Sequence, residues 1–258
     1  IKIKNSISFL NNLAKLKREH SYAKIISITG STGKTSLKNL IKDLLPHFGK
    51  THYSPKSFNN HFGVPISLSN LSYEDKFGVF EVGMSKPGEI KNLTKLIKPH
   101  IGIITNIGEA HIENFKNIHG IAKAKSEIIE NIKVGGTVIL NRDDKFFNFL
   151  SKKAKKYKLN ISTFGKHKDS DVRIDKIIRK VNKSKIFIKI KNQKINLEIR
   201  DINFYNVLAS LAVLKELNLD LSNILTKFKN FKSSEGRGKK YTISRYNKKF
   251  KFIDESYN

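Results

Sequence analysis

The sequence has no cysteine among its 258 residues, and it has no long apolar run. Without cysteine, disulfides and thiolate metal sites are excluded, which fits a reducing cytoplasm. No stretch approaches the roughly 20 apolar residues of a membrane span, and residues 1–5 lack the apolar core of a signal peptide. We therefore expect a cytoplasmic protein with no membrane span. Because position 1 is not Met, we expect a fragment or a trimmed chain.

Acidic residues are scarce: 22 Asp and Glu stand against 50 Lys and Arg, which gives a net charge of +28. Such a charge attracts polyanions, so a nucleic acid partner has to be considered. However, only seven of the basic residues are Arg, and the lysines run along the whole chain instead of forming one block. This distribution favours a coding bias toward A and T over a dedicated polynucleotide surface, and we expect no nucleic acid partner.

The most informative segment is residues 25–36, an apolar run that ends in small residues and Lys-Thr. Glycines at 30 and 33 let backbone N–H groups face phosphate oxygens, Lys34 adds a charge, and the Thr35 hydroxyl suits a Mg²⁺. Position 28 is Ile where the generic motif has Gly, so this is a shorter loop type, and an ordinary glycine turn is the alternative. The residues expected to bind nucleotide here are Gly30, Ser31, Thr32, Gly33, Lys34, Thr35 and Ser36.

Apolar runs that alternate with helical periodicity predict an α/β fold, a P-loop-type, mostly parallel, doubly wound sheet flanked by helices. Period-two alternation over residues 171–199 predicts a small antiparallel sheet appended to it. Residues 6–19 predict an amphipathic helix whose apolar face includes Ile7 and Leu16. A last strand at 250–253 has no evident partner, which suggests that a further domain is missing. Further strands are expected at 25–29, 78–82, 101–105 and 137–140, and further helices at 35–45, 118–131 and 203–217.

Polar clusters follow the predicted strands, where parallel sheets bind ligands. Glu81, at a strand end, is placed to complete an oxygen shell around Mg²⁺ with Thr35. His111 could bind a second cation, although a structural hydrogen bond is the common role of a lone His. Arg237, in a Gly-rich joint, could reach a γ-phosphate or could be a solvated linker charge. The clusters are residues 58–65, 80–90, 105–113, 122–127, 203–206, 236–237 and 254–258.

In order and spacing, these clusters resemble the Mur ligases, ATP-dependent amide-forming enzymes of peptidoglycan precursor synthesis. The motifs that carry the resemblance are Asn-Asn-x-x-Gly-Val-Pro, Glu-Val-Gly-x-x-x-x-Gly-Glu-Ile, Thr-Asn-Ile-Gly-x-Ala-His-x-Glu and Asp-x-Ser-Tyr-Asn, within residues 25–258. The family commonly has His before the Asn203 motif, whereas this chain has Ile202.

The resemblance implies a role for each matching residue. It implies ATP and two Mg²⁺ ions, with Thr35, Glu81, His111 and Lys125 at the metals and Lys125 carbamylated. It implies catalytic roles for Lys34, His111, Lys125 and Arg237. The remaining nucleotide contacts implied are Asn60, whose register the adjacent Asn59 leaves open, Asn206 at the adenine, Arg237 at the γ-phosphate and Asp254 at the ribose.

The substrates implied by the resemblance are UDP-N-acetylmuramoyl-tripeptide and D-alanyl-D-alanine, joined through an acyl phosphate in a monomeric enzyme. The domains implied are a connector helix at 1–20, an ATP-binding domain at 21–235 and the start of a truncated domain at 236–258. A sister ligase for another acceptor is the first alternative. A basic P-loop NTPase that binds nucleic acid is the second, and it leaves the clusters at Glu81, His111 and Lys125 unexplained.

Overall fold

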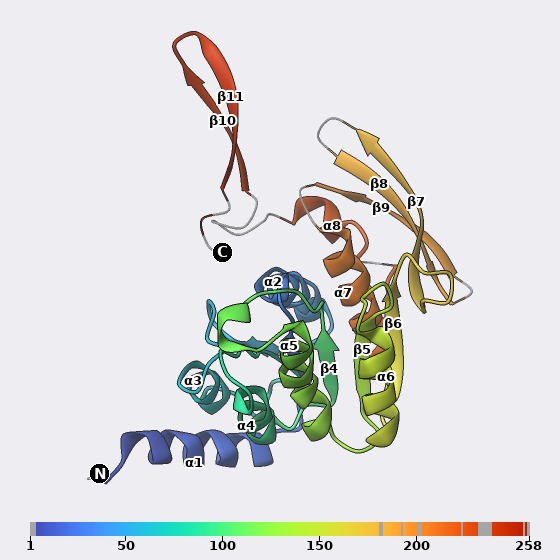
Figure 1. Ribbon diagram of the computed structural model, residues 1–258. Coiled ribbons are helices and arrows are strands. Elements are labelled where there is room, and N and C mark those ends of the chain that lie inside the picture. Colours follow the sequence, from blue (N-terminus) through green and yellow to red (C-terminus); the bar gives the residue numbers. More distant parts are fainter. Residues whose placement is uncertain are drawn as a thin grey trace.

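The computed structural model describes residues 4–180, 183–191, 193–200, 203–222, 224–231, 239–254 and 256. Its main sheet has nine strands in the order β2-β3-β1-β4-β5-β6-β7-β8-β9, and β10 and β11 form a separate hairpin (Figure 1). The strands are β1 (Lys24–Thr29), β2 (Thr51–Tyr53), β3 (Phe77–Glu81), β4 (Ile101–Ile104), β5 (Thr137–Asn141), β6 (Asn160–Gly165), β7 (Val172–Lys180), β8 (Lys183–Ile190), β9 (Gln193–Ile199), β10 (Lys239–Arg245) and β11 (Lys248–Asp254).

Helices precede, connect and follow the strands of the main sheet. They are α1 (Ser6–Glu19), α2 (Lys34–Leu44), α3 (Gly63–Ser69), α4 (Glu89–Ile97), α5 (Ile118–Lys125), α6 (Phe147–Lys156), α7 (Phe204–Glu216) and α8 (Lys227–Asn230), with 3₁₀ turns η1 (Leu45–His47), η2 (Ile112–Asn114) and η3 (Ser126–Asn131). None of the helices in the described part of the chain is long and apolar enough to cross a membrane.

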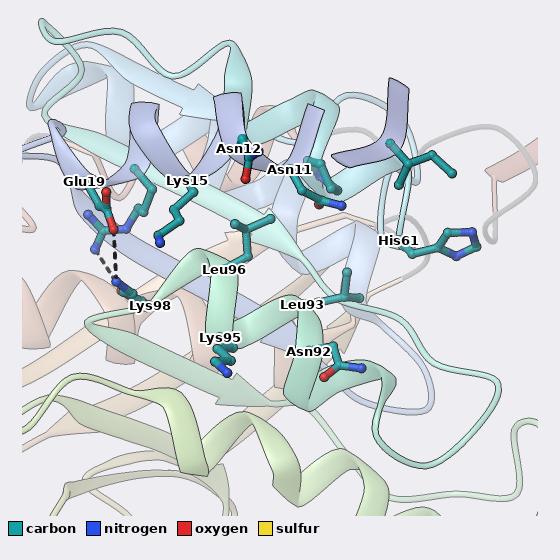
Figure 2. Close-up of a pocket in the computed structure, with 13 residues that line it drawn as sticks. Asn11, Asn12, Lys15, Glu19, His61, Asn92, Leu93, Lys95, Leu96 and Lys98 are labelled. Atoms are coloured by element: carbon teal, nitrogen blue, oxygen red, sulfur yellow. Dashed lines mark hydrogen bonds and ion pairs between the residues drawn. The ribbon is translucent and has the colours of Figure 1, made fainter. Parts of the chain in front are cut away.

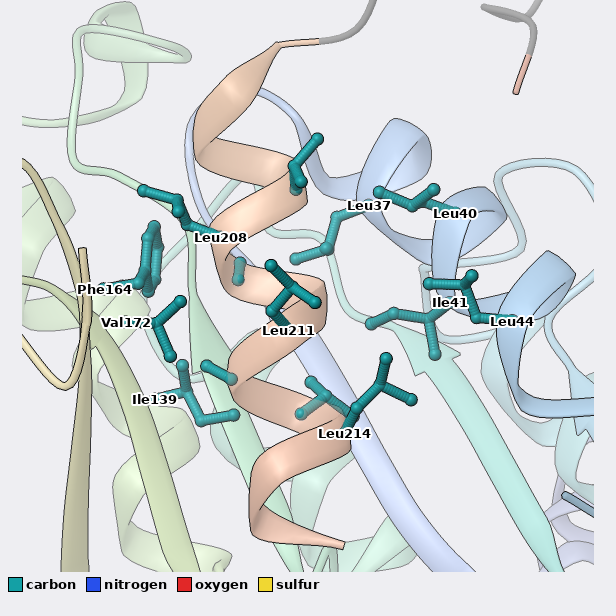
Figure 3. Packing of buried hydrophobic residues seen from close by; sticks show 14 of the residues in the cluster. Leu37, Leu40, Ile41, Leu44, Ile139, Phe164, Val172, Leu208, Leu211 and Leu214 are labelled. Atoms are coloured by element: carbon teal, nitrogen blue, oxygen red, sulfur yellow. The ribbon is translucent and has the colours of Figure 1, made fainter. Parts of the chain in front are cut away.

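Side chains of the central strands alternate between two hydrophobic cores, one on each face of the sheet. In β5, Ile139 packs into the core that contains α2 and α7, whereas Val138 and Leu140 pack into the core under α3 to α6. Because successive residues of a strand point to opposite faces, a strand apolar at both sets of positions is buried on both sides. Figure 3 shows the first core, where leucines of α7 lie between the leucines of α2 on one side and Phe164 and Val172 on the other. The expected doubly wound α/β fold is confirmed.

Strands β1 to β6 run parallel, and β1 lies in the middle of this part of the sheet, between β3 and β4. The chain leaves β1 into α2 on one face and leaves β3 and β4 into α4 and α5 on the other face. Ligands of such sheets bind where the strand order reverses, at the carboxyl ends of the strands. The topology therefore directs a ligand to the ends of β1, β3 and β4.

The appended antiparallel sheet is also confirmed, as an extension of the main sheet beyond β6. Strand β7 joins β6 through two parallel residue pairs, Phe164 with Val172 and Gly165 with Arg173. It then pairs antiparallel with β8, which pairs antiparallel with β9.

The helix predicted at 6–19 is confirmed as α1, although Leu16 is 54% exposed and Ile7 47% exposed. Arg18 of the same helix is buried because its guanidinium binds backbone carbonyls at the end of α4. One detail of the sequence-based fold prediction is wrong. The strand predicted without a partner does have one, because β11 pairs along its whole length with β10.

Candidate active site

The loop between β1 and α2 is built on two glycines with positive φ, +145° at Gly30 and +81° at Gly33. A Cβ at Gly30 would overlap Oγ1 of Thr105, and a Cβ at Gly33 would lie 3.0 Å from Oδ1 of Asn206. Both positions therefore require glycine for their backbone conformation and for the space available.

Helix α2 begins at Lys34 directly after this loop, and no described side chain caps its first turn. The first N–H groups of a helix lack intrahelical partners, and the helix dipole adds partial positive charge at that end. The loop and the start of α2 thus have the geometry that suits phosphate oxygens.

Residues that follow β4 hold the loop in place from the neighbouring strand. Oγ1 of Thr105 donates to the carbonyl of Thr32 over 2.6 Å, and Nδ2 of Asn106 donates to Oγ1 of Thr32 over 2.8 Å. The N–H of Gly108 donates to Oγ of Ser31 over 2.8 Å. Sequence reasoning singled out this cluster only for His111 and did not anticipate that its first residues clamp the phosphate loop.

Two lysines converge on the backbone carbonyl of Gly30. Nζ of Lys34 lies 2.9 Å from this oxygen and Nζ of Lys125 lies 3.2 Å from it. Burial, together with the charge of Lys34, lowers the pKa of Lys125 to about 7. An amine with such a pKa exists in part as the free base at neutral pH, the form that can react as a nucleophile.

Glu81, at the end of β3, is 1% exposed, and its carboxylate accepts hydrogen bonds from two directions. Oγ1 of Thr35 donates to Oε2 over 2.8 Å, and Nδ2 of Asn59 donates to Oε1 over 2.8 Å. The first contact confirms that the two predicted metal-binding side chains lie together. The second shows that the two asparagines have different partners, since Asn59 contacts Glu81 whereas Oδ1 of Asn60 accepts from the backbone N–H of Gly63.

These oxygens fit a Mg²⁺ ion that is bound mainly through phosphates. The described residues contain no group of three or more His, Cys, Asp or Glu side chains that could hold a metal by themselves. Mg²⁺ in nucleotide sites commonly keeps waters and takes only one or two protein ligands beside the phosphates. One hydroxyl and one carboxylate beside a phosphate cradle match that donor set.

A cavity of about 450 Å³ lies beside these groups and brings several predicted residues together. Lys34, Lys125 and His111 line it, as do Asn59 and Asn60. The ring of His111 is about half exposed, with Nδ1 3.8 Å from a carboxylate oxygen of Glu113. His111 thus faces the cavity from an exposed position, and the neighbouring residues Glu109 and Glu113 are exposed as well.

The other predicted nucleotide contacts are less closely grouped. Asn206, at the start of α7, is buried beside Gly33 of the phosphate loop. Asp254 ends strand β11, where its carboxylate accepts from Oγ of Ser256 over 2.7 Å. Arg237 and Gly236 lie outside the described residues, as does the domain boundary expected at 235.

A second cavity, of about 550 Å³, opens between α1 and α4 (Figure 2). Asn11 and Lys15 approach it from α1, and Lys95 approaches it from α4. His61, Asn92 and Leu93 line both cavities, so the two adjoin.

Sequence reasoning missed one buried charge at the site, Lys38, whose Nζ lies 3.8 Å from Oε2 of Glu81. A signal was present, because Lys38 follows Lys34 by four residues and stands among the apolar positions of α2, where a charged side chain needs a partner.

Together, the phosphate cradle, the Thr35–Glu81 pair and the topology define a P-loop-type, nucleotide-binding α/β protein. The family model that describes the Mur ligase middle domain matches residues 28–214 of this chain. The chain therefore belongs to the Mur ligase family.

Curated relatives share a name. A protein of Buchnera aphidicola subsp. Acyrthosiphon pisum, UDP-N-acetylmuramoyl-tripeptide--D-alanyl-D-alanine ligase, is 35% identical over 81% of this chain and 46% of its own length. The protein of the same name in Rickettsia prowazekii is 40% identical over 64% of this chain and 37% of its own length. The chain spans about half the length of the curated relatives it matches, or less.

Solved structures agree with these relatives. MurF from Acinetobacter baumannii superimposes with a TM-score of 0.90 at 28% identity, over 100% of this chain and 56% of that chain. MurF ligase from Thermotoga maritima, solved in complex with ADP, gives a TM-score of 0.87 at 25% identity, over 100% and 59% of the two chains.

Proposed function

We propose that this chain supplies the ATP-binding centre of a ligase that joins D-alanyl-D-alanine to UDP-N-acetylmuramoyl-tripeptide in peptidoglycan precursor synthesis. The observation that carries the proposal is the cavity beside the phosphate loop. Lys34, Lys125 and Asn59 line it, and Asn59 binds the carboxylate of the Thr35–Glu81 pair. The names of the curated relatives support this substrate pair over that of a sister ligase.

The proposed reaction has two steps. The terminal carboxylate of the tripeptide attacks the γ-phosphorus of ATP, the bond to the bridging oxygen breaks, and an acyl phosphate and ADP form. The amine of D-alanyl-D-alanine then attacks the acyl carbon, inorganic phosphate leaves, and the amine loses a proton. Neither step needs a nucleophilic side chain, so the work of the site is to position the reactants and stabilise charge.

In this proposal, Lys34 turns from the Gly30 carbonyl toward the phosphates and neutralises charge on the transferred phosphoryl group. Thr35 and Glu81 hold Mg²⁺, which when bound offsets the negative charge of the phosphate oxygens. His111 and a carbamylated Lys125 contribute to a second Mg²⁺ site, in keeping with their place on the cavity wall.

We further propose that Asn206 and Asp254 contact the nucleotide, the former because it lies beside Gly33. Asn60 and Arg237 remain proposed contacts as well. For the organisation, we propose a connector helix at 1–20, an ATP-binding domain at 21–235 and the start of another domain at 236–258. We expect a cytoplasmic, monomeric enzyme.

The test is phosphate release by the intact protein from ATP and UDP-N-acetylmuramoyl-tripeptide, with D-alanyl-D-alanine compared with other amino acids and dipeptides as acceptors. Release that depends on D-alanyl-D-alanine supports the proposal, and release indifferent to it contradicts the substrate assignment. In the same assay we expect residues 1–258 alone to form no amide product, since the chain covers only part of its relatives.

A further inference from the structure

Lys38 is a buried lysine that the phosphate-binding motif does not account for. Its side chain is 1% exposed, on a helix whose other buried residues are mostly apolar. Removing an ammonium group from water costs several kcal/mol unless an opposite charge and hydrogen bonds compensate it. Its contacts are therefore informative about its role.

Lys38 connects two parts of the site. Its Nζ lies 3.8 Å from Oε2 of Glu81, and both side chains are 1% exposed. The same Nζ donates a hydrogen bond to the backbone carbonyl of Lys56. Lys56 has a φ of +43° and begins the segment that leads to Asn59, so the lysine binds both the carboxylate and the loop beside it.

Asn59 completes a closed arrangement around the same carboxylate. Its side chain donates to Oε1 of Glu81 over 2.8 Å, and its backbone carbonyl accepts from the N–H of Gly83 over 2.8 Å. Glu81 is thus held by Thr35 and Lys38 from α2 and by Asn59 from the loop. The residues after Asn59 line the 450 Å³ cavity, so the arrangement joins the cavity wall to the end of β3.

We propose that Lys38 is a positioning residue for Glu81: it compensates the charge of the carboxylate and fixes the loop that carries Asn59. The proposal rests on the proposed metal site at Thr35 and Glu81. Outer groups that orient a metal ligand change metal affinity by about 10- to 100-fold when they are removed.

The experiment measures Mn²⁺ binding to the intact protein with ADP, by electron paramagnetic resonance, in the variants K38M and K38Q. We expect K38M to weaken Mn²⁺ binding about tenfold, and K38Q less, because glutamine still donates toward the Lys56 carbonyl. Loss of a positive charge would by itself strengthen the binding of a cation. Weaker binding therefore reports lost positioning, and binding as tight as in the parent or tighter overturns the proposal.

The matched control is K42M, which removes a lysine one turn further along α2 whose Nζ lies over the ring of Tyr53 instead of near Glu81. It should leave Mn²⁺ binding within about twofold of the parent, as expected for a site outside the network. A metal-free readout is hydrogen exchange at the Gly83 amide, which should quicken in K38M and remain nearer the parent rate in K38Q. If K38M does not fold, K38Q decides, and Mn²⁺ affinity equal to the parent's overturns the proposal.

E81Q separates this proposal from the metal site on which it rests. If E81Q weakens Mn²⁺ binding and the Lys38 variants do not, the positioning role is wrong and the metal site stands. If neither weakens it, the assignment of Glu81 to the metal is wrong as well.

Discussion

Oγ1 of Thr35 donates a hydrogen bond to Oε2 of Glu81 over 2.8 Å. Thr35 lies in the first turn of the helix after β1, and Glu81 ends the neighbouring strand β3. A hydroxyl has one proton and two lone pairs, so this bond leaves the lone pairs of Thr35 available to a cation. The hydrogen bond is therefore compatible with the metal site that we propose at this pair. The hydrogen bond also gives the buried carboxylate one of its donors.

Thr35→Val tests this relationship because valine matches threonine in shape without the hydroxyl. We expect ADP binding in the presence of Mg²⁺ to weaken about tenfold or more, since valine lacks the oxygen proposed to bind the ion, and even the loss of an outer group around a metal costs about 10- to 100-fold in affinity. ADP binding without Mg²⁺ should change far less. Titration calorimetry of the intact protein, with and without Mg²⁺, makes the comparison.

The control is Thr35→Ser, which keeps the hydroxyl and should retain most of the Mg²⁺-dependent affinity. Equal losses with and without Mg²⁺ in Thr35→Val would show that Thr35 serves the phosphate cradle alone.

Gly33→Ala is expected to harm the nucleotide site more than the fold. A residue with a side chain at the +81° φ of Gly33 costs about 1–3 kcal/mol, and the added Cβ would also press on Asn206. The free energy of unfolding should fall by that amount, and ADP affinity should fall about tenfold or more as the cradle shifts. Urea unfolding and calorimetry measure the two effects.

Gly88→Ala is the matched control for the backbone cost. Gly88 has a φ of +87° and also precedes a helix, but a Cβ at Gly88 would meet nothing within 4 Å. Its unfolding free energy should fall similarly while ADP affinity stays near the parent value. If both variants lose ADP affinity equally, the proposed contact between Gly33 and Asn206 does not matter for binding.

The parts of the fold that the sequence predicted are those encoded by contiguous residues. The phosphate loop lies within twelve residues between a strand and a helix, and the strands near it are apolar on both faces. Strand β2 escaped prediction because it has only three residues, all half-buried, and takes its place by pairing with β3. The partner of β11 was missed for a similar reason, since β10 begins with two lysines in place of an apolar run.

At the site, the sequence indicated residue types but not the contacts between segments far apart. It placed Thr35 beside Glu81 because Thr35 comes after one predicted strand and Glu81 lies at the end of another. It did not predict the contacts of Asn59, since these depend on how the loop after β2 folds against Gly83. Lys38 was missed because its partner is 43 positions away along the chain and becomes a neighbour only when α2 packs on β3.

Arg18→Met should loosen the N-terminal helix from the body of the protein. Nε of Arg18 donates to the carbonyl of Ile97 over 2.6 Å, and Nη2 donates to that of Lys98 over 2.8 Å. These oxygens at the end of α4 would lose their partners, which costs about 2–3 kcal/mol of unfolding free energy. Urea unfolding measures this loss of free energy, and faster hydrogen exchange along α1 would show that the loss arises at this helix.

The control is Lys15→Met, at an exposed position of the same helix, which should change neither measurement. An equal effect of both variants would contradict an anchoring role for Arg18.

His100 should make the protein less stable in acid. Its Nδ1 accepts a hydrogen bond from the backbone N–H of Ile25 over 2.9 Å, and Nδ1 can accept only when the ring is neutral. Burial, and then the positive charges of Lys133, Arg18 and Lys24, lower the pKa of His100 from 6.5 to about 4. Between these two pKa values the unfolded chain binds a proton that the folded chain does not. This contribution to stability is therefore complete above pH 6.5 and is lost as the pH falls to 4.

His100→Asn tests this dependence because asparagine keeps an acceptor but has no titrating ring. The slope of unfolding free energy against pH in this window should therefore fall by about 1.4 kcal/mol per pH unit, the value for one proton. Denaturant unfolding from pH 4 to pH 7 measures the slopes, and His47→Asn, at an exposed position, serves as the control. Because the carboxylates that titrate in the same range are common to all three proteins, parallel curves for the parent and His100→Asn would rule out His100 as the source of acid sensitivity.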